Sequence, residues 1–415
     1  MFKNSMIYTL SSILSAAIPF LLLPVLTRYL SPEEYGQIAM FMILTGALAA
    51  VIGLSAHGAA NRRFFDNDVS NFELARFNGN CFFILLASSS IILLVIAFLD
   101  NTLSNYLGIP VYWVYLAIIS VNCSFVMNLR LGQWQIRGKA KSFGIFQVSN
   151  SLIALSFSLL LVVVLLLGPE GRIYAIVITS AFVGLVSFYT LRNDNLVCFK
   201  YNRQDIREAL FFGVPLIPHV LGAFLLSSID RLVINKELGL EVTGIYMVAV
   251  SLGGGLNVIF SSVNRAFSPW LFEQLKADNL EKKITIVKKT YIFFLCMFLL
   301  SILVFFIAPP ILRLVVGERF HQAAEVLPII LLGQIFLGMY FIVTNYIFYV
   351  RKTKYLSYVT ISCGAINVVL LLLLIPNYGI TGAAVAFLIA NICQFIFTWM
   401  LSSRVYAMPW AIWRA

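Results

Sequence analysis

The sequence predicts an all-α integral membrane protein with twelve transmembrane helices, and three observations indicate this fold class. First, 60% of the 415 residues are hydrophobic, only 11% are charged, and the mean hydropathy is +0.92. Soluble domains average about 25% charged residues, so this composition cannot cover a surface that faces water. Second, the hydrophobic residues gather in long runs. Third, Lys and Arg concentrate in alternate connections between those runs.

Twelve runs are long enough to cross a bilayer, because a spanning helix needs about 20 mostly apolar residues. Helices are expected because a lone strand leaves backbone groups unpaired in lipid, and a barrel would show alternating segments of about ten residues. The first run is too long for a signal peptide and has no cleavage site, which predicts a retained span. The runs lie near 5–27, 36–58, 78–99, 111–132, 143–167, 172–191, 209–229, 243–265, 290–312, 325–349, 355–375 and 380–402.

The distribution of Lys and Arg predicts the orientation. With the N-terminus in the cytoplasm, six of the 29 basic residues lie in outer loops and the other 23 face the cytoplasm. The net charge of +11 is thereby explained without nucleic-acid binding. An even number of spans places the C-terminus in the cytoplasm too. The six outer basic residues are Arg28, Arg172, Arg231, Lys236, Arg313 and Arg319.

The longest connection, residues 266–289, contains a helix start signal. Ser268-Pro269 is typical of an N-cap followed by a proline in the first turn. Trp270 and Leu271 follow, with charged residues on the other positions, which predicts a separate helix lying in the membrane interface.

The two halves of the chain echo each other. Thr27-Arg28 closes the first run before Gly36 opens the second, and Asp230-Arg231 closes the seventh before Gly244 opens the eighth. The segments GRIYAIV and GITGAAV each open the last run of a half. These echoes predict two six-helix bundles related by a pseudo-twofold axis along the membrane normal. The predicted boundaries are an N-terminal lobe at 1–195, a cytoplasmic linker at 196–208 and a C-terminal lobe at 209–415.

No motif of an enzyme or of a metal site is present. The sequence lacks G-x-S-x-G, a Walker A loop, H-E-x-x-H and paired carboxylates within a span. Its three histidines and six cysteines do not have metal-ligand spacing. We therefore expect no catalytic residue, no metal and no cofactor.

The ionisable residues inside the runs are mostly basic. All 18 acidic residues lie in loops or at run ends, and buried charge in a membrane helix is costly enough to mark function. Arginine, histidine and amide groups suit an anionic head group with sugar hydroxyls, although snorkelling arginines and interhelical amide hydrogen bonds would give the same pattern. The substrate-binding candidates are Arg130, Arg265, His219, His57, Asn257, Asn264, Asn128 and Gln133.

Rim and proline positions complete the set of candidate residues. Arg28, Asp230 and Arg231 are expected at the outer rim, where Asp230 pairs with Arg231. Prolines remove a backbone hydrogen bond and kink helices, so spans 1 and 7 are predicted to bend during transport. The prolines that indicate this are Pro19, Pro24, Pro215 and Pro218.

Two stretches resemble a known family. LLLPVLTRYLSPEEYGQIAMF (21–41) and FFGVPLIPHVLGAFLLSSIDRLVINKELGLEVTGIYMVAV (211–250) are similar to the Wzx-type bacterial polysaccharide flippases of O-antigen and capsule synthesis. These belong to the multidrug/oligosaccharidyl-lipid/polysaccharide exporter superfamily. The resemblance covers essentially the whole chain and rests on Leu26-Thr27-Arg28, Pro32, Glu34-Tyr35-Gly36, Pro215-Leu216-Ile217-Pro218, Asp230-Arg231, Gly244-Ile245-Tyr246, Gly379, Gly382 and Ala383.

The resemblance implies two facing bundles that flip an undecaprenyl-pyrophosphate-linked oligosaccharide to the outer leaflet by alternating access. Arg130, Arg265 and His219 would then line the basic cavity. It also implies the bacterial inner membrane as location, with membrane lipids, a polysaccharide polymerase and a chain-length regulator as partners and no nucleic acid. Coupling to a proton or sodium gradient is left open.

Two other functions remain as alternatives. A small-molecule or drug antiporter of the same superfamily is the first, although the sequence has no carboxylate in the middle of a span. A membrane polymerase or ligase of polysaccharide synthesis is the second, although its expected large outer loop is missing. The twelve predicted runs also differ from the fourteen spans of the lipid II flippase relatives.

Overall fold

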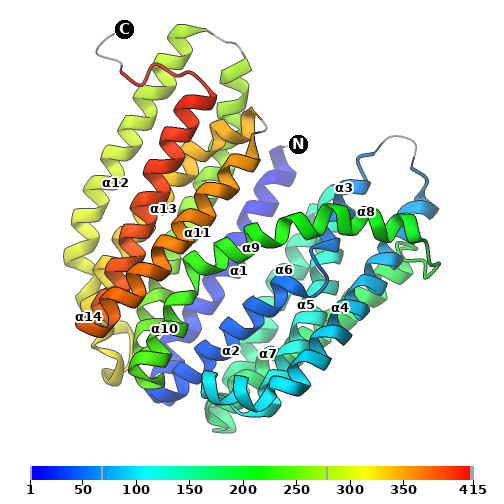
Figure 1. Ribbon diagram of the computed structural model, residues 1–415, viewed down its shortest axis with the longest axis horizontal. Coiled ribbons are helices and arrows are strands. Elements are labelled where there is room, and N and C mark those ends of the chain that lie inside the picture. The colour runs from blue at the N-terminus through cyan, green and yellow to red at the C-terminus, as the bar shows by residue number, and fades with distance from the viewer. Residues whose placement is uncertain (1, 67–68, 277–278, 351, 412–415) are drawn as a thin grey trace. The chain divides into compact units, whose positions relative to one another are not determined.

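The computed structural model describes residues 2–66, 69–276, 279–350 and 352–411, and within these residues it contains helices and no strand (Figure 1). The all-α prediction is therefore confirmed. The α-helices are α1 (Phe2–Tyr29), α2 (Pro32–Val51), α3 (Ala56–Arg63), α4 (Asn71–Leu107), α5 (Val111–Ile136), α6 (Ala140–Ser158), α7 (Gly168–Asn193), α8 (Arg203–Gly213), α9 (Ile217–Ser227), α10 (Ile229–Leu238), α11 (Leu240–Lys276), α12 (Leu280–Val315), α13 (Ala323–Tyr349) and α14 (Thr353–Val405).

Eleven helical stretches in the described part of the chain are long and apolar enough to cross a membrane. The last of them lies in α14, where Gly379 has non-helical backbone angles of φ 56° and ψ −137°. This kink joins two helices, which correspond to the predicted runs 355–375 and 380–402. Twelve crossings and two cytoplasmic termini stay predictions.

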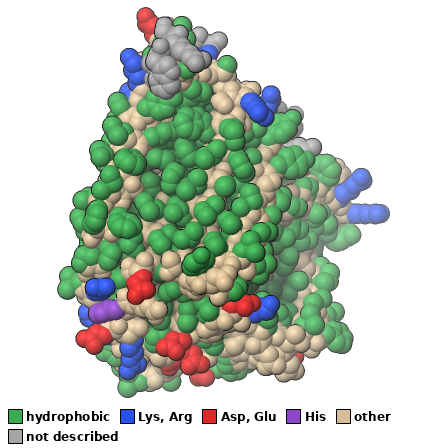
Figure 2. All heavy atoms as spheres, turned by 60° about the vertical axis from the view of Figure 1, so that its left-hand side comes forward, with side chains coloured by type: hydrophobic (Ala, Val, Ile, Leu, Met, Phe, Trp, Pro, Cys, Tyr) green, Lys and Arg blue, Asp and Glu red, His purple; other side chains and the backbone are tan. Residues whose placement is uncertain are grey.

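Hydrophobic side chains cover the surface of these helices, as a lipid solvent requires. Figure 2 shows a face coated with hydrophobic side chains, with charged ones gathered toward its two ends. On α12, Phe298, Leu303, Phe306 and Leu314 are all more than half exposed. The chain is thus a multi-pass membrane protein.

The chain forms two compact units. Unit 1 comprises residues 1–22 and 29–224, and unit 2 comprises residues 23–28 and 225–415. Their boundary therefore falls inside α1 and inside α9. The predicted lobes and the predicted linker at 196–208 stay predictions.

Local signals in unit 1 begin and end its helices as the sequence suggests. Ser31 and Glu34 form a capping box: the Ser31 hydroxyl accepts from the Glu34 N–H at 3.3 Å, and Glu34 Oε2 accepts from the Ser31 N–H at 2.7 Å. Ser70 and Glu73 repeat this arrangement at the start of α4. Gly108 ends α4 with a positive φ of 67°, which glycine adopts without strain.

The prolines of α1 leave that helix continuous, whereas those of the seventh predicted span coincide with an interruption. α1 remains helical through Pro19 and Pro24. Pro19 leaves the Ser15 carbonyl without its helical donor, and the Ser151 hydroxyl of α6 donates to this carbonyl at 3.1 Å. In the seventh predicted span, α8 ends at Gly213 and a 3₁₀ turn, Val214–Leu216, precedes α9. The predicted interruption at Pro215 is present in this span.

Unit 2 is built around α13, which is buried along most of its length. Phe260 of α11 and Phe395 of α14 pack against Ile335 and Val343 of α13. The last turn of α1 belongs to this unit, because the Gly317 N–H donates to the Thr27 hydroxyl at 3.1 Å.

The prediction of a separate interfacial helix beginning at Ser268 is wrong. α11 continues through Pro269 to Lys276. Leu271 and Leu275 are buried against Ile286 and Tyr346. Their packing extends α11 past a local start signal, since tertiary contacts override local preference.

Candidate functional site

A polar cavity of about 190 Å³ lies between three helices of unit 1. Its lining residues stand near the middle of α5 and α6 and along the first half of α7, and most of them are half-buried. It is lined by Ser120, Ser124, Met127, Asn150, Ala154, Arg172, Ile176, Thr179 and Ser180. The lining includes one cation, four hydroxyls, one amide and no carboxylate.

Arg172 provides the charge of the cavity. Its Nη1 donates to the Ser158 hydroxyl at 2.5 Å, and this hydroxyl donates to the Ala154 carbonyl at 2.6 Å. Among the described residues, no Asp or Glu pairs with Arg172. The guanidinium thus carries an uncompensated charge in an apolar bundle, where a free charge is costly.

Gly171 explains how α7 brings Arg172 so close to α6. A Cβ at this position would lie 2.8 Å from the Leu161 carbonyl oxygen, closer than side chains tolerate. Leu161 belongs to a π-helical segment, Leu159–Val164, and such segments often occur at functional sites. In the segment GRIYAIV, Gly171 therefore permits the close packing of α7, and Arg172 supplies the charge of the cavity.

Two further groups of the cavity have unused hydrogen-bonding capacity. The Thr179 side chain is 3% exposed, and its hydroxyl has no partner within the described part of the chain. The Asn150 side chain likewise makes no hydrogen bond to described residues. Buried polar groups are normally paired, so the Thr179 hydroxyl indicates that the cavity holds water or a polar ligand, whereas the half-buried Asn150 can also contact solvent.

The prediction that Arg172 lies in an outer loop is wrong, and its role in this cavity was missed. The residue lies in the second turn of α7 and lines the cavity. The predicted run starts at Arg172 itself, so this arginine counts with the loop that precedes the run, whereas the helix begins at Gly168. The preceding Pro169 and Gly171 were the signal that the helix starts earlier, because proline favours the first turn.

Arg130 is buried in an ion pair. Its side chain is 2% exposed, its Nη2 donates to Asp194 Oδ2 at 2.5 Å, and its Cζ lies 4.1 Å from the Trp134 ring centroid. Lys139 Nζ lies 3.6 Å from the same carboxylate oxygen. The hydrogen bond from Arg130 lowers the pKa of Asp194 below its ordinary value. Asp194 therefore balances the charge of Arg130, whose Nε and Nη1 have no partner among the described residues.

The neighbouring candidates separate in space. Gln133 is buried and links Asn61 to Arg137, with two hydrogen bonds of 3.4 Å. Asn128 is exposed on α5. His57, on α3, packs edge to face on Phe125 at 5.5 Å. Of these three residues, Gln133 is the one whose side chain hydrogen-bonds to other side chains in the described part of the chain.

In unit 2, Asp230 contacts Tyr246 as well as its sequence neighbour Arg231. Its carboxylate accepts from the Tyr246 hydroxyl at 2.9 Å and from the Arg231 backbone N–H at 2.9 Å, whereas the Arg231 Nε lies 3.7 Å away. The Tyr246 partner was not predicted. Both motifs of the resemblance, Asp230-Arg231 and Gly244-Ile245-Tyr246, meet in this buried contact.

The remaining candidates in unit 2 are dispersed. Asn264 accepts from the Asn345 amide at 2.7 Å, which joins α11 to α13. Arg265 is exposed and donates to the Ser261 carbonyl at 3.5 Å, and Asn257 is half-buried. Arg28 is exposed. The side chain of His219 lies outside the described residues, and substrate binding by all these residues stays a prediction.

Sequence comparison places the chain among proteins of polysaccharide synthesis. The family described as "Polysaccharide biosynthesis protein" matches residues 1–275, and the family described as "MatE" matches residues 215–373. "Lsg locus putative protein 1" of Haemophilus influenzae is 27% identical over 398 residues, 92% of this chain and 95% of that protein. "Capsular polysaccharide biosynthesis protein CapF" of Staphylococcus aureus is 25% identical over 434 residues, 98% of this chain and 100% of that protein.

Structural comparison identifies the fold. An inward-facing structure of a multidrug resistance MATE family transporter of the MOP superfamily has a TM-score of 0.73 to this chain. The match covers 99% of this chain and 96% of that one, at 16% sequence identity. The predicted superfamily resemblance is thereby confirmed for the fold.

Proposed function

The chain belongs to the family of polysaccharide biosynthesis proteins, and we propose that it is a flippase for a lipid-linked glycan. It moves an undecaprenyl-pyrophosphate-linked repeat unit from the cytoplasmic to the outer leaflet of the bacterial inner membrane by alternating access. The product serves O-antigen or capsule synthesis, and a polymerase and a chain-length regulator act after it.

The observation that carries this proposal is the uncompensated Arg172 in a polar cavity without carboxylates. A guanidinium binds phosphate oxygens through charge-assisted hydrogen bonds, and the surrounding hydroxyls and amide can complete the shell. The cavity has a volume of about 190 Å³, which is far above the roughly 10–15 Å³ that one water needs, so it has room for a phosphate group. Arg172 therefore holds the pyrophosphate.

A drug antiporter is the second candidate, because the MATE transporter cited above has the same fold. A cationic drug would need a carboxylate in its site. The lining of the cavity has none, which favours an anionic cargo. The sequence contains none of the catalytic motifs named above, so no observation favours a polymerase or ligase.

The test is lipid flipping in proteoliposomes. A fluorescent undecaprenyl-pyrophosphate glycan in one leaflet becomes accessible to a quencher in the other when the protein flips it. Losing a hydrogen bond to a charged group costs about 1.5–3 kcal/mol, so Arg172→Ala is expected to slow flipping roughly 10- to 100-fold. Arg172→Lys should retain part of the rate, because it keeps the charge and loses the bidentate geometry.

The matched control is Arg192→Ala, which removes an exposed arginine from the other end of α7. It should flip at the wild-type rate. Wild-type rates for Arg172→Ala would overturn the role of the cavity. Efflux of a cationic dye by the wild type, without glycan flipping, would instead establish the antiporter.

A further inference from the structure

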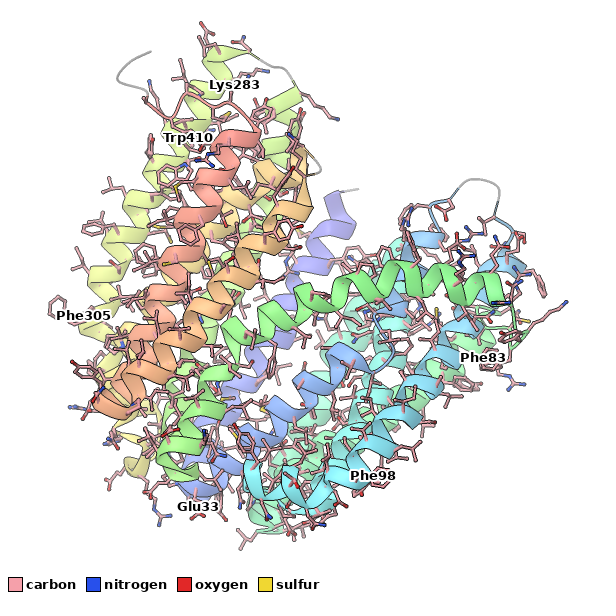
Figure 3. All side chains as sticks on the ribbon, in the orientation of Figure 1. Glu33, Phe83, Phe98, Lys283, Phe305 and Trp410 are labelled. Carbon is pink, nitrogen blue, oxygen red and sulfur yellow. The ribbon has the colours of Figure 1, made fainter. Side chains whose placement is uncertain are left out.

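A second recess in unit 1 is larger than the polar cavity and differs from it in chemistry. This groove has a volume of about 540 Å³ and lies between the end of α2, the middle of α4 and the inner face of α8. Figure 3 labels Phe83, one of its α4 residues. The groove is lined by Val51, Leu54, Phe83, Ile84, Ala87, Ser88, Ile91, Ile92, Tyr201, Ile206 and Leu210.

The groove offers almost nothing to a polar ligand. Ser88 donates to the Leu85 carbonyl at 3.0 Å and accepts from the Gly53 N–H at 2.8 Å, so its hydroxyl is already satisfied. Apart from the hydroxyl of the exposed Tyr201, the other lining residues present hydrocarbon and aromatic surface. Transferring an unpaired polar group from water into such a site costs free energy, so the site favours a hydrocarbon chain.

Helix α8 is fixed in place as a wall of the groove. The Asn202 side chain caps the helix by accepting from the Asp205 N–H at 3.1 Å. Asp205 is buried and accepts from Arg76 Nε of α4 at 2.8 Å. At the other end, Gly213 lies so close to the Leu54 carbonyl that no side chain would fit. These contacts hold α8 against α4 and keep the groove open.

Three basic residues flank the lining residues of the groove in sequence, and their helix positions place them at its rim. Arg203 stands one turn before Ile206, on the side of α8 that also carries Leu210, and Arg207 follows Ile206 directly. Lys200 precedes the lining residue Tyr201. The three basic side chains are exposed and form no ion pair with any described residue. By contrast, Arg63 and Arg76 close by are paired with acids.

An apolar groove beneath an unpaired basic rim is complementary to an anionic lipid with a long chain. Within α4 the lining runs from Phe83 to Ile92, about 13 Å at 1.5 Å per residue, which accommodates a segment of a chain. We propose that this groove binds the polyisoprenyl chain of the lipid-linked substrate next to its pyrophosphate, which the rim holds. The choice of a polyisoprenyl chain rests on the proposed function, and the groove acts as an entry site before the pyrophosphate reaches Arg172.

Photo-crosslinking tests the groove without requiring transport. The probe is a polyisoprenyl phosphate with a benzophenone in its chain, added to the purified protein in nanodiscs. We expect crosslinks to map to residues 83–92 and 201–210. Filling the groove from either wall, by Ala87→Trp or by Leu210→Trp, should lower labelling about tenfold. Arg203→Gln combined with Arg207→Gln should weaken binding severalfold.

Two controls separate the groove from the lipid-facing surface. Leu86→Trp places the same bulk on a neighbouring α4 residue that is 62% exposed and does not line the groove. It should label like the wild type. A phospholipid with two acyl chains and an anionic head should compete at least ten times less well than unlabelled polyisoprenyl phosphate.

Wild-type labelling of both tryptophan variants, with wild-type thermal stability, would overturn the proposal. Equal competition by the acyl phospholipid would also overturn it, because the groove would then accept any anionic lipid. If the wild type labels in the groove but does not flip the glycan, the proposed function fails while the lipid site stands. If the wild type flips the glycan but is labelled outside the groove, the proposed function stands and the lipid site fails.

Discussion

Arg130 and Arg172 of unit 1 differ in whether an acidic residue pairs with them. Arg130 is paired with Asp194 and stacked on Trp134, whereas Arg172 has no acidic partner among the described residues. Arg130 already donates to Asp194, a carboxylate that it shares with Lys139, although two donors of Arg130 remain unused. The structure therefore shifts the main expectation for anion binding from Arg130 to Arg172.

The ion pair of Arg130 and Asp194 makes stability depend on pH. The hydrogen bond from Arg130 lowers the pKa of Asp194 below its ordinary value. A carboxylate with a lowered pKa stabilises the fold above the unfolded pKa of about 4, and this contribution disappears as the pH falls through the folded pKa. Asp194→Asn should therefore lower the free energy of unfolding by about 1–3 kcal/mol at pH 7.

Thermal unfolding in detergent between pH 3 and pH 7 measures this effect. The difference between the wild type and Asp194→Asn should shrink below pH 4. Asp66→Asn is the control, because Asp66 is 38% exposed and pairs with the partly exposed Arg63, where ion pairs contribute little. An equal difference at both ends of the pH range would contradict the assignment.

At the scale of elements, α1 and α9 are the helices that both units share. The boundary between the units falls between Leu22 and Leu23 in α1, next to Pro24, and between Phe224 and Leu225 in α9. Pro24 leaves the Phe20 carbonyl without a helical donor, which makes bending at this level easier. We therefore keep the prediction that these helices bend during transport.

Stapling α1 tests this bending. In a cysteine-free background, Leu21→Cys and Val25→Cys stand one turn apart across Pro24, and a short bifunctional crosslinker fixes that turn. Crosslinking should lower flipping at least tenfold, and cleavage of the crosslinker should restore it. The same pair at Ile302 and Phe306, exposed on α12, should have no effect. Unchanged flipping after complete crosslinking of α1 would rule out bending there.

At the scale of the whole molecule, the number of times that the chain crosses the membrane can be tested. Gly379 interrupts α14 with a positive φ, and the chain on either side is helical. The chain turns back at this kink, because a Cβ on Gly382 would collide with the Leu374 carbonyl (Figure 1). If both parts of α14 span the bilayer, the chain crosses it twelve times and both termini lie in the cytoplasm. If only one of them does, the termini lie on opposite sides.

Cysteine accessibility decides between the two arrangements. Single cysteines replace Glu33, Tyr378 and Arg207 in a cysteine-free protein, and intact cells are treated with an impermeant thiol reagent. Twelve crossings predict labelling at Glu33 and Tyr378 from outside and at Arg207 only after permeabilisation, because basic loops face the cytoplasm. Labelling of Arg207→Cys in intact cells would invert the predicted orientation.

The sequence alone determined the solvent, the helical fold and most helix positions, because lipid forces long apolar runs whose backbone groups pair internally. The structure shows capping boxes at Ser31 and Ser70, which depend only on neighbours in the chain. Tertiary structure decided the rest. Asp194 beside Arg130, Tyr246 beside Asp230 and the helix extension through Pro269 arise from segments far apart in sequence. Arg172 became a site residue only when α5 and α6 closed a polar cavity around it, since the charge balance of an arginine depends on neighbours in space.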